Sequence, residues 1–192
     1  MTTPPQALDD LDVAARLSRQ IVGLIGPSDW ALPTPCTKWS VRALVSHMLV
    51  GNQRFASAAG TRQPPHGDHE LSDAQLASAY PDSLEALREA FAAPGALDKT
   101  VTVPFGSVPG AVALKLRVTE LLVHGWDLVQ ATGKHVEFPT QTCEEALTFS
   151  KAFRGQLPPE GGPFDAPQPV DDDALAIDRL AAYLGRPVAR AR

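Results

Sequence analysis

The sequence predicts an all-α protein with a buried helical core, and three observations support this prediction. Apolar residues recur every three to four positions along most of the 192-residue chain, as they do on one face of a helix. Proline and glycine residues interrupt this pattern at a few places and divide the chain into segments of helix length. Residues of β type cluster only at 97–110, where we expect an extended segment or a short hairpin.

The first two predicted helices are joined by a loop that contains prolines. The first covers residues 6–25 and stops at a Gly-Pro pair, which breaks helices. Its apolar side chains recur on one face, which we expect to pack in the core. The second covers residues 40–59, with Ser40 as its N-cap and a glycine directly after it.

A capping box marks the start of the third predicted helix. Ser72 and Gln75 have the spacing at which each side chain caps the backbone of the other. This helix ends at a Pro-Gly pair, and Pro81 inside it should kink or divide it. A fourth helix over residues 111–132 and a fifth over residues 140–153 follow.

The C-terminal part of the chain has a different composition. Residues 154–170 are rich in proline and glycine, which predicts an irregular, extended segment. A short amphipathic helix follows over residues 172–185. We expect residues 1–192 to form a single domain, with residues 154–192 packed on its helices.

Composition and charge exclude several functional classes. Apolar residues make up 44% and charged residues 20% of the chain, and the net charge is −5 without a basic stripe, so we expect no nucleic-acid partner. No apolar run approaches the roughly 20 residues that span a bilayer, and acidic residues stand where a signal peptide is basic. Two distant cysteines, Cys36 and Cys143, fit a reducing compartment. We therefore expect a cytoplasmic monomer or homodimer that is not bound to membranes.

The fourth predicted helix carries ionisable residues among apolar ones. Glu120 and His124 are four residues apart and share one face, and Asp127 lies beside them. Apolar side chains surround this face, and burying a carboxylate beside an imidazole is costly unless something compensates. A bound cation would compensate, because it takes a neutral imidazole and an ionised carboxylate directly. The alternative is a partly exposed Glu–His pair without a metal.

The second predicted helix adds a further ionisable group. His47 lies in an apolar stretch, and its neighbours one turn away, Ala43 and Gly51, are small and would leave room next to the imidazole. By itself His47 fits a hydrogen-bonded core residue better than a ligand. Together with Glu120 and His124 it predicts a three-ligand metal site that leaves a position open for water or substrate. Nitrogen and oxygen ligands suit zinc, nickel, iron or cobalt.

Two further residues are candidates for a catalytic role beside the predicted metal. Arg54 returns to the face of His47 and would clamp an anionic group. Asp127 either orients a histidine or replaces Glu120 as a ligand, and we favour the orienting role.

Weaker candidates lie in loops. His66 and His69 have an HxxH spacing in a Pro/Gly loop, which fits a solvated loop better than a ligand pair. Cys36 precedes a helix N-terminus, which can lower a thiol pKa, but an inert thiol is the better interpretation. Trp39 and Trp126 are expected in the core or at the mouth of the site.

Several segments of the chain resemble a known family. They are TPCTKWSVRALVSHMLVGNQRF, VPFGSVPGAVALKLRVTELLVHGWDLVQATG and GPFDAPQPVDDDALAIDRLAAYLGR, and the HGWDL run at 124–128 is fairly specific. They resemble the actinobacterial metal-binding proteins of the DinB/YfiT-like superfamily. The most similar group is related to the N-terminal domain of mycothiol-dependent maleylpyruvate isomerase.

This resemblance implies a fold, a site and an activity. It implies a DinB-like four-helix bundle with extra short C-terminal helices, with His47, Glu120 and His124 as ligands of a metal that is usually zinc. It also implies that the metal activates the thiolate of mycothiol toward a small electrophilic substrate. Because the isomerase has a further C-terminal domain, transfer of the thiol fits this chain better than isomerisation does. The alternatives are a non-catalytic metal-binding regulator or partner-binding bundle, and a hydrolase that uses metal-bound water.

Overall fold

A computed structural model describes residues 4–37, 39–60, 71–103, 106–155 and 165–188 of the chain. His66 and His69 of the predicted HxxH loop lie outside these residues, as does the middle of the proline-rich segment. No helix in the described ranges is both long enough and apolar enough to cross a membrane.

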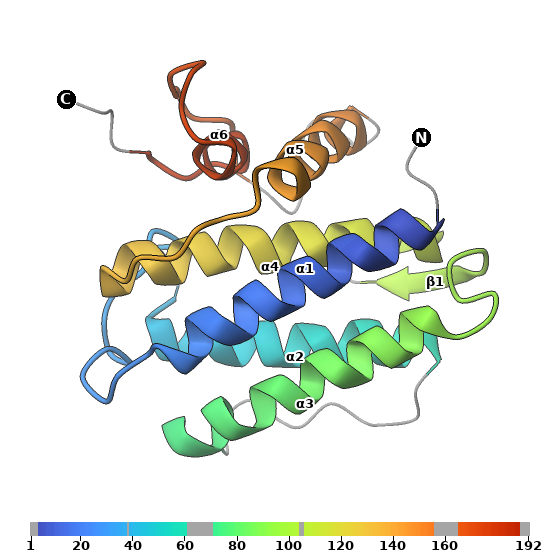
Figure 1. Ribbon diagram of the computed structural model, residues 1–192, viewed down its shortest axis with the longest axis horizontal. Coiled ribbons are helices and arrows are strands. Elements are labelled where there is room, and N and C mark those ends of the chain that lie inside the picture. The colour runs from blue at the N-terminus through green and yellow to red at the C-terminus, as the bar shows by residue number, and fades with distance from the viewer. Residues whose placement is uncertain (1–3, 38, 61–70, 104–105, 156–164, 189–192) are drawn as a thin grey trace.

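Four long helices form a bundle around a common apolar core. Helices α1 and α2 each contact both α3 and α4 (Figure 1). The bounds of the four helices are α1 Pro4–Gly23, α2 Val41–Ala59, α3 Asp73–Ala92 and α4 Gly110–Thr132. Buried aliphatic side chains from all four fill the space between them. This arrangement confirms the predicted all-α, DinB-like four-helix bundle.

The helix starts follow the local signals in the sequence. The hydroxyl of Ser40 accepts a hydrogen bond from the backbone N–H of Ala43, and both hydrogen bonds of the Ser72–Gln75 capping box are present. Helix α3 is not divided at Pro81, however. Tyr80, the residue before this proline, is fully buried, so tertiary packing holds the helix together across this position, and a kink at Pro81 stays a prediction.

The predicted hairpin is present at one end of the bundle. Strand β1 (Thr100–Val103) pairs antiparallel with β2 (Gly106–Pro109), and α4 begins directly after it. A Cβ atom added at Gly110 would lie 2.0 Å from the carbonyl oxygen of Ala96. The glycine at the start of α4 is therefore required by a close approach of two backbone segments.

Two further helices cover one side of the bundle. Helices α5 (Thr140–Arg154) and α6 (Ala176–Tyr183) contact each other and α4, and Figure 1 shows them on the α4 side of the bundle. Helix α6 is shorter than predicted, because a turn from Asp171 to Ala174 precedes it. The indole N–H of Trp126 in α4 donates to the carboxylate of Asp178 in α6 over 2.7 Å, which ties this layer to the bundle. That residues 1–192 form one domain stays a prediction.

Candidate metal centre

Helices α2 and α4 bring two of the predicted ligands together. The ring centroids of His47 and His124 are 5.2 Å apart, and the two planes are nearly perpendicular at 86°. His124 is buried and His47 is half-buried. Trp39, from the loop before α2, stacks on His47 with 4.2 Å between ring centroids. Trp39 therefore lines the candidate centre, whereas Trp126 packs in the core.

The surroundings of His47 keep its imidazole neutral. Burial is the largest cause that lowers its pKa, and together with the neighbouring His124, Arg117 and Arg54 it brings the pKa to about 3. A neutral imidazole has a lone pair available for a metal, whereas an imidazolium does not. Near pH 7 this histidine is therefore in the form that a metal ligand requires.

Glu120 is held by a buried arginine that sequence reasoning missed. The Arg117 side chain is fully buried, and its Nη1 donates to Glu120 Oε2 over 2.6 Å. The same guanidinium donates from Nε to Asn52 Oδ1 over 2.9 Å and from Nη2 to the carbonyl oxygen of Met48 over 2.6 Å. Arg117 thus joins α4 to α2 and balances the negative charge of the Glu120 carboxylate. Its position three residues before Glu120 in an apolar helix is a signal that the sequence offered.

The role predicted for Gly51 is wrong. A Cβ atom at this position would lie 2.4 Å from Nη1 of Arg117. The small residue therefore makes room for the guanidinium of Arg117 and not for the imidazole of His47. The sequence pattern identified a close approach at this turn of α2 but not the side chain that makes it.

Asp127 lies where a residue that orients His124 would lie. Its Oδ2 is 3.0 Å from Nδ1 of His124, and its side chain is fully buried. Arg186, after α6, donates from Nη2 to Oδ2 over 3.0 Å and from Nε to Oδ1 over 3.3 Å. With Nδ1 engaged by Asp127, the Nε2 atom of His124 is the one available to a metal. Arg186 was missed, and no spacing in the sequence connects it with Asp127.

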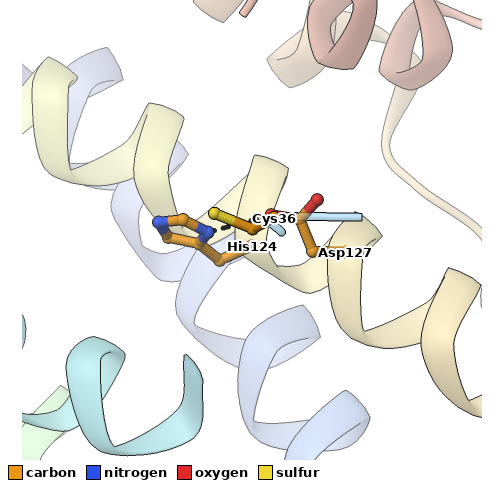
Figure 2. A group of neighbouring side chains, drawn as sticks. All are labelled: Cys36, His124 and Asp127. Carbon is orange, nitrogen blue, oxygen red and sulfur yellow. Dashed lines mark hydrogen bonds and ion pairs between the residues drawn. The ribbon is translucent and has the colours of Figure 1, made fainter. Parts of the chain in front are cut away.

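Cys36 is the second side chain that the loop before α2 brings to the centre. Ligand atoms of Cys36, His124 and Asp127 all lie within 4.8 Å of one another. Figure 2 shows the sulfur of Cys36 next to the imidazole of His124, and the carboxylate of Asp127 joined to that ring by a hydrogen bond. Cys36 was interpreted as an inert thiol, because nothing in the sequence relates its loop to α4.

The residues present fit a divalent metal ion. Two imidazoles, a carboxylate and a thiol are the donors that zinc takes in proteins, and the partly buried setting limits competition from water. Arg54, the predicted anion clamp, is exposed on α2, and its charge acts on His47. That His47, Glu120 and His124 bind the metal stays a prediction.

The fold and the site define the class of this protein, which is a helical bundle with a histidine pair between two of its helices. Comparison with known proteins identifies the family within this class. Residues 11–129 match the family described as the mycothiol maleylpyruvate isomerase N-terminal domain. This range covers more than half of the chain and contains His47, Glu120 and His124. The chain therefore belongs to this family.

Two curated relatives are similar over most of their length. The uncharacterized protein Rv0738 of Mycobacterium tuberculosis is 37% identical over 158 residues, which cover 81% of this chain and 84% of the relative. The uncharacterized protein MT0763 from another strain of the same species matches with the same values.

Solved structures show the same fold at low sequence identity. The crystal structure of the mycothiol-dependent maleylpyruvate isomerase matches with a TM-score of 0.56 and 16% identity over 66% of this chain. A mutant of that enzyme matches with a TM-score of 0.53 and 17% identity over the same share. In both cases the match spans 60% of the isomerase chain.

Proposed function

We propose that this protein binds a divalent metal, with zinc as the preferred ion, and acts as a mycothiol-dependent transferase or isomerase. The observation that supports this proposal is the pair of facing imidazoles of His47 in α2 and His124 in α4, whose ring centroids are 5.2 Å apart. Membership in the family supports mycothiol as the thiol that this protein uses, because the family takes its description from a mycothiol-dependent enzyme.

In this proposal the chain holds the metal and orients the reactants. His47, His124 and Glu120 are the proposed ligands, with His47 kept neutral by burial. Asp127 is a positioning residue, because its hydrogen bond fixes the ring of His124. When bound, the metal would act as a Lewis acid that favours the thiolate form of a small thiol at neutral pH.

Other side chains at the centre would select the substrate. Arg54 is exposed beside His47 and offers a positive charge to an anionic group of the thiol or of the electrophile. Trp39 shields one face of His47 and would exclude water from that side. Transfer of the thiol to an electrophile and isomerisation would both use a thiolate that a metal activates.

One observation favours a second candidate function. Arg117 already compensates the charge of Glu120 inside the bundle, so the carboxylate has a structural role that does not require a metal. A metal-binding regulator without catalysis, or a bundle that binds a protein partner, would have the same network.

Metal content and thiol binding distinguish these candidates. We expect the metal-free protein to take up one equivalent of zinc, measured by mass spectrometry of the desalted protein, and we expect His47→Ala and His124→Ala to lose this uptake. His135→Ala is the matched control, because this histidine is exposed between α4 and α5.

Calorimetric titration of the zinc-loaded protein with mycothiol tests the second half of the proposal. Heat that saturates in the native protein and is absent from the His47→Ala variant supports a thiol-dependent enzyme. If the protein binds one equivalent of zinc but shows no heat with mycothiol, the proposed dependence on mycothiol is contradicted. That result would favour the metal-binding regulator without catalysis. Stoichiometric zinc in both histidine variants would contradict the proposed ligands.

A further inference from the structure

We propose that Cys36 supplies a thiolate ligand to the metal held by His124, so that the loop between α1 and α2 is part of the metal centre. This inference rests on the proposed metal site and adds a ligand to it. Its basis is the group formed by Cys36, His124 and Asp127, whose ligand atoms lie within 4.8 Å of one another (Figure 2).

The distances fit a coordination sphere that closes around an ion. In a four-coordinate zinc site the bonds are about 2.0–2.3 Å long, which places the ligand atoms roughly 3.5 Å from one another. The 4.8 Å limit of the group exceeds this spacing by roughly 1.3 Å, so Cys36 would have to move toward His124 when an ion binds. This movement falls on a loop, whereas His124 is fixed in a buried helix.

The loop directs Cys36 and Trp39 to the same centre. The carbonyl oxygen of Cys36 accepts hydrogen bonds from the N–H of Trp39 over 2.9 Å and from Oγ1 of Thr34 over 3.1 Å. Trp39 then stacks on His47, while Cys36 lies beside His124. One turn of the loop thus places an aromatic ring on the first histidine and a sulfur on the second.

The third member of the group, Asp127, is less suited to bind the metal. Oδ2 of Asp127 contacts Nδ1 of His124, and Arg186 donates to both of its oxygens. A carboxylate with these partners would have to exchange buried hydrogen bonds for a metal bond. Thiolate sulfur is a preferred ligand of zinc, and its chemistry favours Cys36 as the additional donor.

The added ligand changes the resting state expected of the centre. If the proposed ligands His47 and Glu120 bind the same ion as His124, Cys36 would bring the number of protein ligands to four, which is the number that closes a zinc site. A small thiol carries the same donor atom as Cys36, so the two would compete for one position. The activity proposed above would then depend on how readily the loop releases the sulfur.

X-ray absorption at the zinc edge tests this proposal on the full chain. The sample contains one equivalent of zinc and a phosphine as reductant, with no small thiol present. We expect one sulfur neighbour at about 2.3 Å, distinct from the nitrogen and oxygen neighbours at about 2.0–2.1 Å. Cys36→Ser should abolish the sulfur neighbour. Cys143→Ser should retain it, because Cys143 is buried in α5.

Cobalt provides a second measurement that does not depend on zinc. The cobalt-loaded protein should show the intense near-ultraviolet charge-transfer band of a thiolate ligand, and Cys36→Ser should lose it while the circular dichroism of the helices is unchanged. Bound zinc without a sulfur neighbour, or a sulfur signal that persists in Cys36→Ser, would overturn the role of Cys36 and leave the proposed function intact. Failure of the native protein to bind zinc or cobalt would overturn the proposed function as well.

Discussion

The buried guanidinium of Arg117 allows a quantitative test of how the bundle tolerates charge. In the metal-free protein, Arg117→Met removes the partner of Glu120 and keeps an unbranched, uncharged side chain in the core. The carboxylate is almost buried, and the donors to Asn52 and to the carbonyl of Met48 disappear with the charge. Breaking a buried ion pair by removing one partner costs about 3–5 kcal/mol. We expect the free energy of unfolding in urea to fall by about that amount.

Zinc and a second substitution separate the contribution of charge from that of packing. In the double variant Arg117→Met, Glu120→Gln no uncompensated charge remains, so we expect at least about 1 kcal/mol to be recovered in the absence of metal. If Glu120 binds the metal, zinc should also reduce the loss caused by Arg117→Met, because the ion takes over the role of the guanidinium. A loss below about 1 kcal/mol for the single variant would refute the reasoning.

Three further predictions concern the same core and one site outside it. Gly51→Ala should lower the free energy of unfolding by about 1–3 kcal/mol, since its Cβ would lie 2.4 Å from the guanidinium of Arg117. Asp127→Asn should weaken zinc binding by roughly 10–100-fold in a chelator competition, since it orients His124. Burial, with a smaller effect of Glu145, raises the pKa of Asp10 from 3.8 to about 6. The folded state therefore holds a proton that the unfolded state releases, and stability falls as the pH rises from about 4 to 6. Asp10→Asn should remove this fall and stabilise the protein at pH 7 by on the order of 1 kcal/mol, after screening by solvent.

Matched controls accompany these three predictions. A Cβ atom at Gly23 meets no atom within 4 Å, so Gly23→Ala should not destabilise the protein. His135→Ala should leave zinc affinity unchanged. Asp82→Asn, at an exposed position of α3 and not among the charges that shift the pKa of Asp10, should keep the native dependence of stability on pH. Gly51→Ala with native stability would mean that Arg117 moves without cost. An Asp10→Asn variant that loses stability at pH 7 would contradict the sign of the pKa shift.

The helices of the site were predictable from the sequence, but the network between them was not. Periodicity and capping residues located α2 and α4 to within one residue of the observed bounds, because these signals are local. The contact of Arg117 with Asn52 depends on how the two helices are rotated about their axes. The pattern of apolar residues does not determine that rotation. For the same reason Gly51 was linked to His47 and not to the guanidinium that it accommodates.

Loops and the C-terminal segment were the least predictable parts. Cys36 and Trp39 reach the centre through a loop whose path is set by contacts with the folded bundle, so their neighbours cannot be derived from spacing. Arg186 is 59 residues from Asp127, and the proline-rich segment between them has no periodicity that relates the two positions. Pro81 shows the opposite case, in which a local signal that can divide a helix does not divide it, because packing around the buried Tyr80 holds the two parts together.

The ion pair between Arg186 and Asp127 shows that the folded unit of this chain extends beyond the residues that match the family. The family match ends at residue 129, yet the positive charge that balances the fully buried Asp127 comes from Arg186, well beyond it. A fragment cut at the family boundary would leave a carboxylate inside the protein without its counterion. In this chain the segment after α6 is therefore part of the same folded unit as the bundle, because it supplies the charge that balances a carboxylate on α4.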